Sequence, residues 1–340
     1  MHKKDQYLAL PAAYLKLFLQ YAAATGLDLE PLLEEAGLGV ENLLDANRAV
    51  DFETVRRVLG RVTLRFGEGW HLALSERFTV AAHGALGFAV VTAPDVRSAI
   101  DVLLRYFGIR GPFLWPSGAV EGEEFVIRFY ESQAMGEERR LLIELALLSM
   151  QELIERPLGH TLRGARLAFA LPRPAYHEAL SRSFHARLGF DARRHSLRLP
   201  LAWLDQPCAM HDDAMHRYLL ARCEAELRET AGGLPAEVAV RQALLATPGH
   251  MPDLAEIAAA QNLSARTLIR RLKRGGTSYR AIREGVRRTL ATDYLANSQL
   301  SVSRIAYRLG YQDPSNFGRA FRGWFGMSPG RYRKKNARAR

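Results

Sequence analysis

The sequence is poor in cysteine, with only Cys208 and Cys223 among 340 residues. Two cysteines cannot build a disulfide framework, and such a content is typical of a reducing compartment, so we expect a cytoplasmic location. No apolar run approaches the roughly 20 residues that a membrane-spanning helix requires. The N-terminus begins with positive charge and becomes apolar, as a signal peptide does. Lys16 and Gln20 interrupt its apolar run, which favours a helix beginning near Pro11 instead.

Motifs of common catalytic sites are also missing. The sequence has no nucleophile elbow, no Walker loop and no HExxH pattern. The adjacent carboxylates at 123–124 and 137–138 lie in turn-like segments, where solvation explains them better than acid–base chemistry does. Four potential metal ligands follow one another in a spacing that matches no usual zinc pattern, namely Cys208, His211, His216 and Cys223. We therefore expect no enzyme activity, no metal site and no cofactor.

The chain has an excess of basic residues, and this excess is confined to its C-terminal end. From Arg241 onward there are 20 Lys and Arg residues against 5 Asp and Glu, whereas the preceding 240 residues have 27 against 31. A strongly positive segment next to an ordinary, weakly acidic one indicates a domain that binds a polyanion.

Residues 253–333 contain one short pattern twice. The first copy, DLAEIAAAQNLSARTLIRRLK, begins at Asp253, and the second, SVSRIAYRLGYQDPSNFGRAFR, begins at Ser301. Three apolar positions recur 48 residues later, namely Leu254, Ile257 and Ala258 as Val302, Ile305 and Ala306. Two further apolar positions and one arginine recur 49 residues later, after one extra residue in the turn, namely Leu268, Leu272 and Arg270 as Phe317, Phe321 and Arg319. A shared period of this kind indicates a duplicated supersecondary unit.

Each copy is predicted to form a helix, a tight turn and a second helix. The apolar residues at i, i+3 and i+4 make one buried face of the first helix. In the first copy the chain reverses at Asn262, because Asn tolerates the left-handed conformation, and Ser264 caps the second helix. In the second copy Gly310 forms the turn, Asp313 is the cap and Pro314 takes the first helical position.

The second helix of each copy has an apolar inner face and a polar outer face, as a helix in the DNA major groove requires. Arg can pair with guanine, Asn with adenine, and Lys or Ser with phosphate. A pair of surface helices with solvated arginines is the alternative, but two copies in register on a basic segment favour DNA. The predicted DNA-binding residues are Ser264, Ala265, Arg266, Ile269, Arg270, Lys273, Arg274, Pro314, Ser315, Asn316, Arg319 and Arg322.

The residues between the copies, 277–297, are predicted to form one long helix with Ile282, Val286 and Leu290 at steps of four. Such a helix is roughly 30 Å long, at about 1.5 Å per residue. That length is close to one turn of DNA, about 34 Å. A single chain could therefore place both outer helices in successive major grooves on one face of a duplex.

The stretch GYQDPSNFGRAFRGWFGMSPGRYR, residues 310–333, closely resembles the signature of the AraC/XylS transcription regulators. The resemblance covers about the last hundred residues and implies two helix-turn-helix units joined by a long helix. Carried over by motif position, it implies base reading by Arg266 and Arg270 in the first unit and by the residues at 315, 316 and 319 in the second. The first turn has Asn262 where the family usually has Gly, and we expect the fold to survive this change.

The rest of the chain is predicted to be an α+β domain. Helices are expected at 11–24, 29–36, 52–66, 99–107, 139–155 and 174–184, and strands at two places within 113–131, at 166–171 and at 197–199. A connecting helix at 212–230, a linker at 231–235 and a helix at 236–246 follow. The predicted domains are an effector-binding and dimerisation domain at 1–207, a connecting helix and linker at 208–235, an all-α DNA-binding domain at 236–336 and a basic tail at 337–340.

The stretch HGALGFAVVTAPDVRSAIDVLLRYF, residues 83–107, is similar to the arabinose-binding-type domain that accompanies one branch of this family. The resemblance implies effector binding, dimerisation or both. Aromatic side chains near it can line a ligand cavity or simply form the core. The candidate effector-binding residues are His83, Trp70, Tyr106, Phe113, Trp115 and Phe129.

These observations predict a sequence-specific transcription regulator, most simply a ligand-responsive dimeric activator in the cytoplasm. Its expected partners are double-stranded promoter DNA, a small-molecule effector, a second copy bound through the N-terminal domain and, by family resemblance, RNA polymerase. One alternative makes the N-terminal domain a protein-interaction module without an effector. Another makes it an enzyme fused to a DNA-binding tail. A roomy pocket with convergent polar groups would favour the effector hypothesis over the interaction module.

Overall fold

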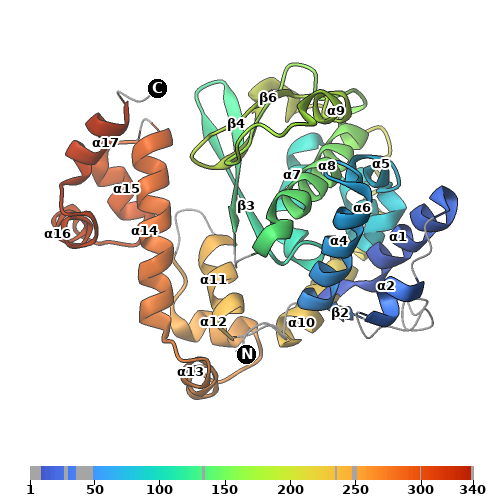
Figure 1. Ribbon diagram of the computed structural model, residues 1–340. Coiled ribbons are helices and arrows are strands. Elements are labelled where there is room, and N and C mark those ends of the chain that lie inside the picture. The colour runs from blue at the N-terminus through green and yellow to red at the C-terminus, as the bar shows by residue number, and fades with distance from the viewer. Residues whose placement is uncertain are drawn as a thin grey trace. The chain divides into compact units, whose positions relative to one another are not determined.

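The computed structural model describes residues 9–26, 30–35, 49–131, 135–233, 236–246, 251–298 and 300–337. The chain forms two compact units, Met1–Gly233 and Leu234–Arg340 (Figure 1). We refer to them as the N-terminal unit and the C-terminal unit and describe each by itself. Among the described residues, no helix has both the length and the apolar character needed to cross a bilayer.

The N-terminal unit contains a five-stranded sheet in the order β3-β4-β7-β5-β6. The strands are β3 (Leu114–Glu121), β4 (Glu124–Glu131), β5 (Arg166–Ala168), β6 (Arg187–Gly189) and β7 (His195–Pro200). The hairpin predicted within 113–131 is confirmed, with Glu121 opposite Glu124. Its two-residue turn needs a positive φ, which Gly122 supplies at +63°. Strand β7 pairs antiparallel with both β4 and β5, so it joins the hairpin to the rest of the sheet.

Nine described helices accompany this sheet, together with a small antiparallel pair formed by β1 (Ala9–Pro11) and β2 (Ala49–Asp51). The helices are α1 (Ala12–Thr25), α2 (Glu30–Glu35), α4 (Phe52–Phe66), α5 (His71–Ser75), α6 (Gly84–Val91), α7 (Val96–Tyr106), α8 (Arg139–Leu158), α9 (His177–Ser183) and α10 (Asp213–Gly233). Helix α8 packs against α5, α6 and α7 and is buried on most of its circumference. A helix that is apolar nearly all round belongs in a core, and α8 is the centre of this one.

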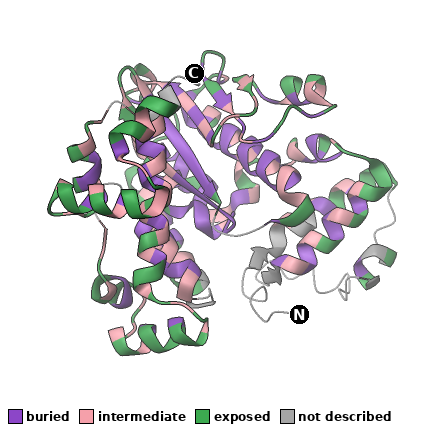
Figure 2. Cartoon of the chain, turned by 60° about the vertical axis from the view of Figure 1, so that its left-hand side comes forward, coloured by how far each residue is buried: buried purple, intermediate pink, exposed green. Residues whose placement is uncertain are grey.

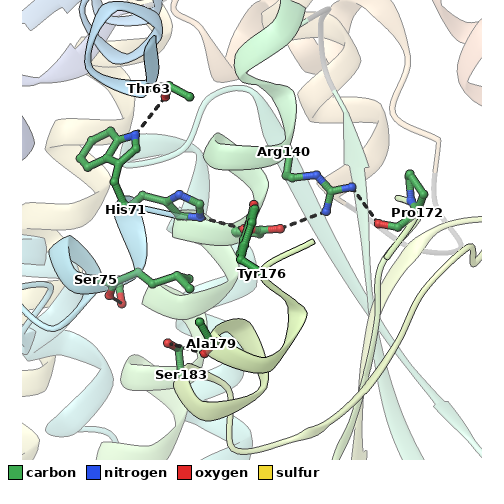
Figure 3. Close-up of polar contacts among 11 residues, drawn as sticks. Thr63, His71, Ser75, Arg140, Pro172, Tyr176, Ala179 and Ser183 are labelled. Carbon is green, nitrogen blue, oxygen red and sulfur yellow. Dashed lines mark hydrogen bonds and ion pairs between the residues drawn. The ribbon is translucent and has the colours of Figure 1, made fainter. Parts of the chain in front are cut away.

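The buried carboxylate of Glu144 in α8 ties several elements together (Figure 3). Its side chain is fully buried and accepts hydrogen bonds from Tyr176 Oη at 2.9 Å and Arg140 Nη1 at 3.2 Å. Its Oε2 also lies 2.7 Å from His71 Nε2 in α5. Arg140 donates in turn to the carbonyl of Pro172. A charge removed from water requires such partners, and these come from three separate segments.

The structure differs from the sequence-based expectations mainly at short or edge elements. The strand expected at 166–171 ends at Ala168, and the helix expected at 174–184 spans only His177–Ser183. Strands β1, β2 and β6 have three residues each and were not predicted, because so few residues show no alternation. Helix α10 continues to Gly233, so the first three residues of the expected linker are helical. Residues 234–235 of that linker, 29 and 36 of the second expected helix, and 338–340 of the basic tail lie outside the described residues.

The C-terminal unit is all-helical in its described residues. Its helices are α11 (Ala236–Ala246), α12 (Leu254–Ala260), α13 (Ala265–Arg274), α14 (Tyr279–Asn297), α15 (Val302–Arg308), α16 (Pro314–Phe325) and α17 (Pro329–Ala337). Helix α14 runs between the α12–α13 pair and the α15–α16 pair (Figure 1) and buries the predicted residues Ile282, Val286 and Leu290. The helices of this unit turn one side inward and expose the other (Figure 2).

Helix α17 was not predicted, because its sequence is strongly basic and has little apolar periodicity. Tertiary contacts hold it. Tyr332 packs against the rings of Phe321 and Phe325. Arg333 donates to the carbonyls of Leu295 and Leu300, at the end of α14 and just beyond it. Locally, Ser328 accepts from the N–H of Arg331 and Pro329 takes the first helical position. Contacts with residues distant in sequence complete the final helix.

Candidate nucleic-acid interface

The first helix-turn-helix is α12, a turn at Asn262 and α13. Helix α12 begins with a capping box, in which Asp253 accepts from the backbone N–H of Glu256 and Glu256 accepts from that of Asp253. Asn262 has a φ of +53°, the left-handed conformation that the sequence predicted. Ser264 accepts from the N–H of Thr267 at 3.2 Å and so caps α13, as predicted. These local interactions determine where the chain reverses between the two helices.

The second helix-turn-helix, α15 and α16, repeats the first at the level of individual hydrogen bonds. In the first turn the N–H of Leu263 donates to the carbonyl of Ala258 at 2.8 Å. In the second, the N–H of Tyr311 donates to the carbonyl of Ala306 at 3.0 Å, and each residue lies 48 positions after its counterpart. Gly310, with a φ of +71°, corresponds to Asn262. The predicted caps are confirmed as well, since Asp313 accepts from the N–H of Ser315 and Pro314 begins α16.

The position of Asn262 allows a test of the turn. Replacing Asn262 by Gly should leave the C-terminal unit as stable or more stable, by up to about 1 kcal/mol, because Gly adopts a positive φ without steric cost. Replacing it by Ala should destabilise the unit by about 1 kcal/mol, since Ala has no side-chain group that favours this conformation. Urea denaturation of the full chain measures both. A more stable Asn262→Ala than Asn262→Gly variant would contradict the role assigned to the turn.

The outward faces of α13 and α16 are exposed, and their inward faces are buried. Leu268 and Leu272 of α13, and Phe317 and Phe321 of α16, are at most 1% exposed. Ala265 and Pro314, at the starts of these helices, are half-buried. The predicted residues that the structure leaves exposed are Ser264, Arg266, Ile269, Arg270, Lys273, Arg274, Ser315, Asn316, Arg319 and Arg322. Arg319 Nη2 donates to Asn316 Oδ1 at 2.5 Å, one helical turn away, so these two side chains lie together on the outer face of α16.

Helix α14 adds a basic surface that the sequence reasoning did not single out. Arg280, Arg283 and Arg287 recur at steps of three and four, and this spacing was the signal available in the sequence. They line a hollow of about 740 Å³ with Tyr311 and with Trp324 of α16. The indole N–H of Trp324 donates to Glu284 Oε1 at 2.9 Å, which ties α16 to α14 across this hollow.

Arg287 holds the second turn against α14. Its Nε donates to the carbonyl of Leu309 at 2.7 Å, and its Nη2 donates to the carbonyl of Gly310 at 2.8 Å. Its guanidinium also lies 4.3 Å from the ring centroid of Tyr311. A Cβ on Gly310 would lie 3.2 Å from Arg287 Nη2, so Gly permits both the left-handed φ and this close approach. Helix α14 therefore fixes the orientation of α15 and α16 within the C-terminal unit.

Replacing Arg287 by Ala should lower the stability of the C-terminal unit by about 2–3 kcal/mol, because two charge-assisted hydrogen bonds and a cation–π contact are lost. Thermal denaturation of the full chain measures this effect. Arg280→Ala is the matched control, since Arg280 is an exposed arginine of the same helix, and its cost should stay within about 0.5 kcal/mol. Equal costs in the two variants would show that Arg287 does not hold the turn.

The structure distributes the six candidate effector residues over several sites of the N-terminal unit. His83 and Phe113 line an apolar cavity of about 90 Å³. Trp70 lines a separate pocket of about 450 Å³ with Thr63, His71, Tyr176 and several charged side chains, and its indole N–H donates to Thr63 Oγ1 (Figure 3). Tyr106 donates its hydroxyl to Glu224 of α10. Trp115 and Phe129 are buried in β3 and β4.

Of the four potential ligands, the two histidines hold the start of α10 against α6. His211 Nδ1 lies 3.0 Å from the carbonyl of Thr92, and His216 Nδ1 lies 2.9 Å from that of Ala89. Cys208 and Cys223 are buried free thiols, and burial raises the pKa of each to about 11. Both therefore stay protonated at neutral pH. Within the described ranges, no three His, Cys, Asp or Glu side chains gather as a metal site.

Each of the two units matches a family of known protein domains. Residues 26–208 match the family described as the N-terminal arabinose-binding domain of AraC transcription regulators, and residues 257–335 match a helix-turn-helix domain family. Over 328 residues the chain is 31% identical to the ornithine utilization regulator of Pseudomonas aeruginosa, covering 96% of each. It is 32% identical over 187 residues to the transcriptional activator NphR of Rhodococcus sp, covering 51% of this chain and 54% of that one. The crystal structure of the transcriptional regulator CdpR from Pseudomonas aeruginosa is similar with a TM-score of 0.47 and 21% identity, covering 95% and 98% of the two chains.

Proposed function

The chain belongs to the AraC family of DNA-binding transcription regulators, and we propose from this that α13 and α16 enter successive major grooves of promoter DNA. Regulators of this family are not enzymes, and the chain is a regulator of the same kind. The observation that carries the proposal is the repetition of one hydrogen-bonded turn, 48 residues apart, with an exposed arginine-bearing helix after each copy.

Within these helices we assign base reading to Arg266 and Arg270 of α13 and to Ser315, Asn316 and Arg319 of α16. An exposed guanidinium is suited to the O6 and N7 of guanine and an amide to adenine. Three of the remaining exposed residues, Lys273, Arg274 and Arg322, lie further along the two helices, where contact with phosphate contributes affinity and little specificity. Ser264, at the start of α13, is suited to phosphate as well. Ile269, 42% exposed, would make an apolar contact, such as one with a thymine methyl group.

We further propose that the N-terminal unit binds a small molecule and pairs with a second copy, so that two chains hold repeated half-sites. Two hollows support an effector over a pure interaction module. The pocket of about 450 Å³ is roomy and brings charged and polar side chains together, and the cavity that contains His83 joins an apolar interior to a buried polar group. The name of the Rhodococcus relative, a transcriptional activator, supports activation, and activation would require contact with RNA polymerase. Such a protein works where the chromosome is, which in a bacterium is the cytoplasm.

Footprinting on the DNA around its own gene tests the proposal. We expect each chain to protect two short stretches on one face of the duplex, about 10 base pairs apart, because α14 separates the two helices by roughly one DNA turn. Affinity should fall steeply as the salt concentration rises, since phosphate contacts release counterions. Protection of a single stretch per chain, or no specific protection in any promoter fragment, would refute two-groove binding.

A further inference from the structure

The cavity in the N-terminal unit is lined by elements that are remote in sequence. Its walls come from α1, α4, α5, α6 and α8 and from the short 3₁₀ turns Val80–His83 and Phe107–Ile109. Most of the lining is aliphatic or aromatic, with Phe18, Leu59, Leu86, Phe113 and Leu142 among its residues. Filling apolar space of this kind with an apolar molecule is favourable, because apolar surface is removed from water.

His83, one of the lining residues, has a ring nitrogen without a partner in the part of the chain that the structure describes. His83 is 1% exposed, and its Nδ1 lies 2.9 Å from the hydroxyl of Tyr14. Its Nε2 is buried and has no hydrogen-bond partner among the described residues. Burial and the charge of Arg110 lower the pKa of His83 to about 4, so the ring is neutral at pH 7 and Nε2 is either a donor or an acceptor. An orphaned buried group of this type costs free energy until a partner arrives.

Arg110 connects this cavity to α10, the last element of the N-terminal unit. Its Nε donates to the carbonyl of His83 at 3.0 Å, and its Nη2 donates to Glu226 of α10 at 3.0 Å. Gly84, with a φ of +58°, admits the guanidinium, because a Cβ there would lie 2.7 Å from Arg110 Nη2. Helix α6, which follows His83, also packs along α10 and accepts from His216 through Ala89. Hydrogen bonds and an ion pair therefore connect the wall of the cavity to α10, the helix that precedes the C-terminal unit in the chain.

We propose that this cavity is the effector site and that it takes a small uncharged alcohol whose hydroxyl forms a hydrogen bond with His83 Nε2. Through Arg110, binding of the alcohol in the cavity is coupled to the position of α10. This inference rests on the proposed function, because it assigns the site and ligand class of the effector. A hydroxyl both donates and accepts, so it matches either tautomer of the imidazole. A charged head group is disfavoured, because the guanidinium of Arg110 is already paired with Glu226 and most of the lining is apolar.

The volume of the cavity limits the size of the apolar part of the ligand. An apolar cavity of about 150 Å³ accommodates benzene. A cavity of about 90 Å³ therefore takes an apolar body of roughly four carbons. Butan-1-ol fits this description, and pentane has nearly the same shape with a methyl group in place of the hydroxyl, so the two probes separate the polar contact from the packing.

The first experiment measures binding of butan-1-ol and pentane to the full-length protein by ligand-observed NMR and thermal shift. We expect both probes to bind and Ser149→Leu, which fills the cavity, to lower both affinities at least tenfold. Ser183→Leu is the matched control, since both serines are half-buried and donate to the carbonyl four residues earlier, but Ser183 lies on α9, whose residues do not line the cavity. His83→Phe should lower the affinity for butan-1-ol about tenfold and leave that for pentane within about twofold.

Two results would overturn the site. One is binding of butan-1-ol that Ser149→Leu and a second filling variant, Ala146→Leu, both leave unchanged. The other is the absence of binding by either probe up to its solubility. A loss of pentane affinity equal to that of butan-1-ol in His83→Phe would overturn the assigned hydrogen bond.

The second experiment measures operator affinity with and without butan-1-ol. We expect butan-1-ol to change operator affinity at least threefold in the wild-type protein and in Ser183→Leu, but not in Ser149→Leu. Glu226→Ala removes the ion pair with Arg110 at a residue outside the cavity lining, so it should keep butan-1-ol binding and lose the change in operator affinity. Persistence of that change would refute the route through Arg110. Operator binding by the unliganded protein reports separately on the proposed function. If that binding is absent, the DNA-binding proposal fails, whereas its presence without any response to butan-1-ol refutes the effector site alone.

Discussion

A chain that carries both Arg270→Ala and Arg319→Ala is expected to lose about 2–6 kcal/mol of binding free energy at its operator. Each single substitution should cost about 1–3 kcal/mol and relax specificity at one base pair, because a bidentate contact with guanine is lost. The two arginines lie on α13 and α16, which belong to different helix-turn-helix units. Their effects should therefore add to within about 0.5 kcal/mol.

Titration of operator DNA with the single and double variants measures these costs. Arg319→Lys keeps the charge but not the planar fork, so it should lose specificity at its base pair while preserving the salt dependence. Arg182→Ala is the control, since Arg182 is an exposed arginine of α9 in the N-terminal unit, and it should bind as the wild type does. An Arg319→Ala chain with an unchanged footprint and affinity would remove Arg319 from the set of base-reading residues.

Asn316 gives this experiment a further test of geometry. Its Oδ1 accepts from Arg319 Nη2, so the free protein already holds the guanidinium in one orientation. We expect Asn316→Ala to weaken operator binding through two losses, its own contact with a base and the orientation of Arg319. The Asn316→Ala and Arg319→Ala substitutions should therefore be less than additive, in contrast to the pair on separate helices.

The second large effect is expected at Glu144. Replacing it by Leu should lower the free energy of unfolding of the N-terminal unit by about 3–5 kcal/mol, because the partners of the buried carboxylate would lose their acceptor. These partners are the side chains of His71, Tyr176 and Arg140, which come from α5, from the segment before α9 and from α8 itself. The pocket lined by Trp70 and Tyr176 would lose its shape together with this cluster.

Chemical denaturation of the full chain, followed by tryptophan fluorescence, measures the cost. Glu152→Ala is the matched control, since Glu152 lies on the same helix and pairs with Arg156 at the surface, where such a pair contributes at most about 1 kcal/mol. If Glu144→Leu is as stable as the control, the buried cluster contributes nothing net to stability. That result is known for buried ion pairs replaced by well-packed apolar residues, and it would refute the anchoring role assigned here.

Much of the DNA-binding unit could be predicted, because its signals are local. The cap of α13 at Ser264, the left-handed residue Asn262 and the alternation of Leu268 with Arg270 all involve residues within a few positions of one another. Such short-range signals survive in a single sequence, and their repetition after 48 residues removed the remaining ambiguity. Helix α17 shows the limit, since its order depends on rings and carbonyls of α14 and α16.

The N-terminal unit was predictable in class and in its longer elements, but its sites were not. The hairpin of β3 and β4 and the buried helix α8 followed from apolar patterns. The six aromatic and histidine candidates were chosen by residue type, and the structure brings only His83 and Phe113 to the same cavity. Arg110, which links that cavity to α10, carried no signal, because an arginine before a glycine in a loop has no periodic context.

By itself, the sequence determined that this protein has two helix-turn-helix units on a basic C-terminal segment, and with them a DNA-binding fold. It could do so because helix caps, left-handed turns and apolar periods depend on neighbours along the chain. Only the tertiary structure decided that β7 lies between β4 and β5, and that Tyr14, His83, Arg110 and Glu226 form one connected set. Contacts between residues 27 to 116 positions apart arise from packing of the whole core, and packing leaves no repeating pattern in the order of the amino acids.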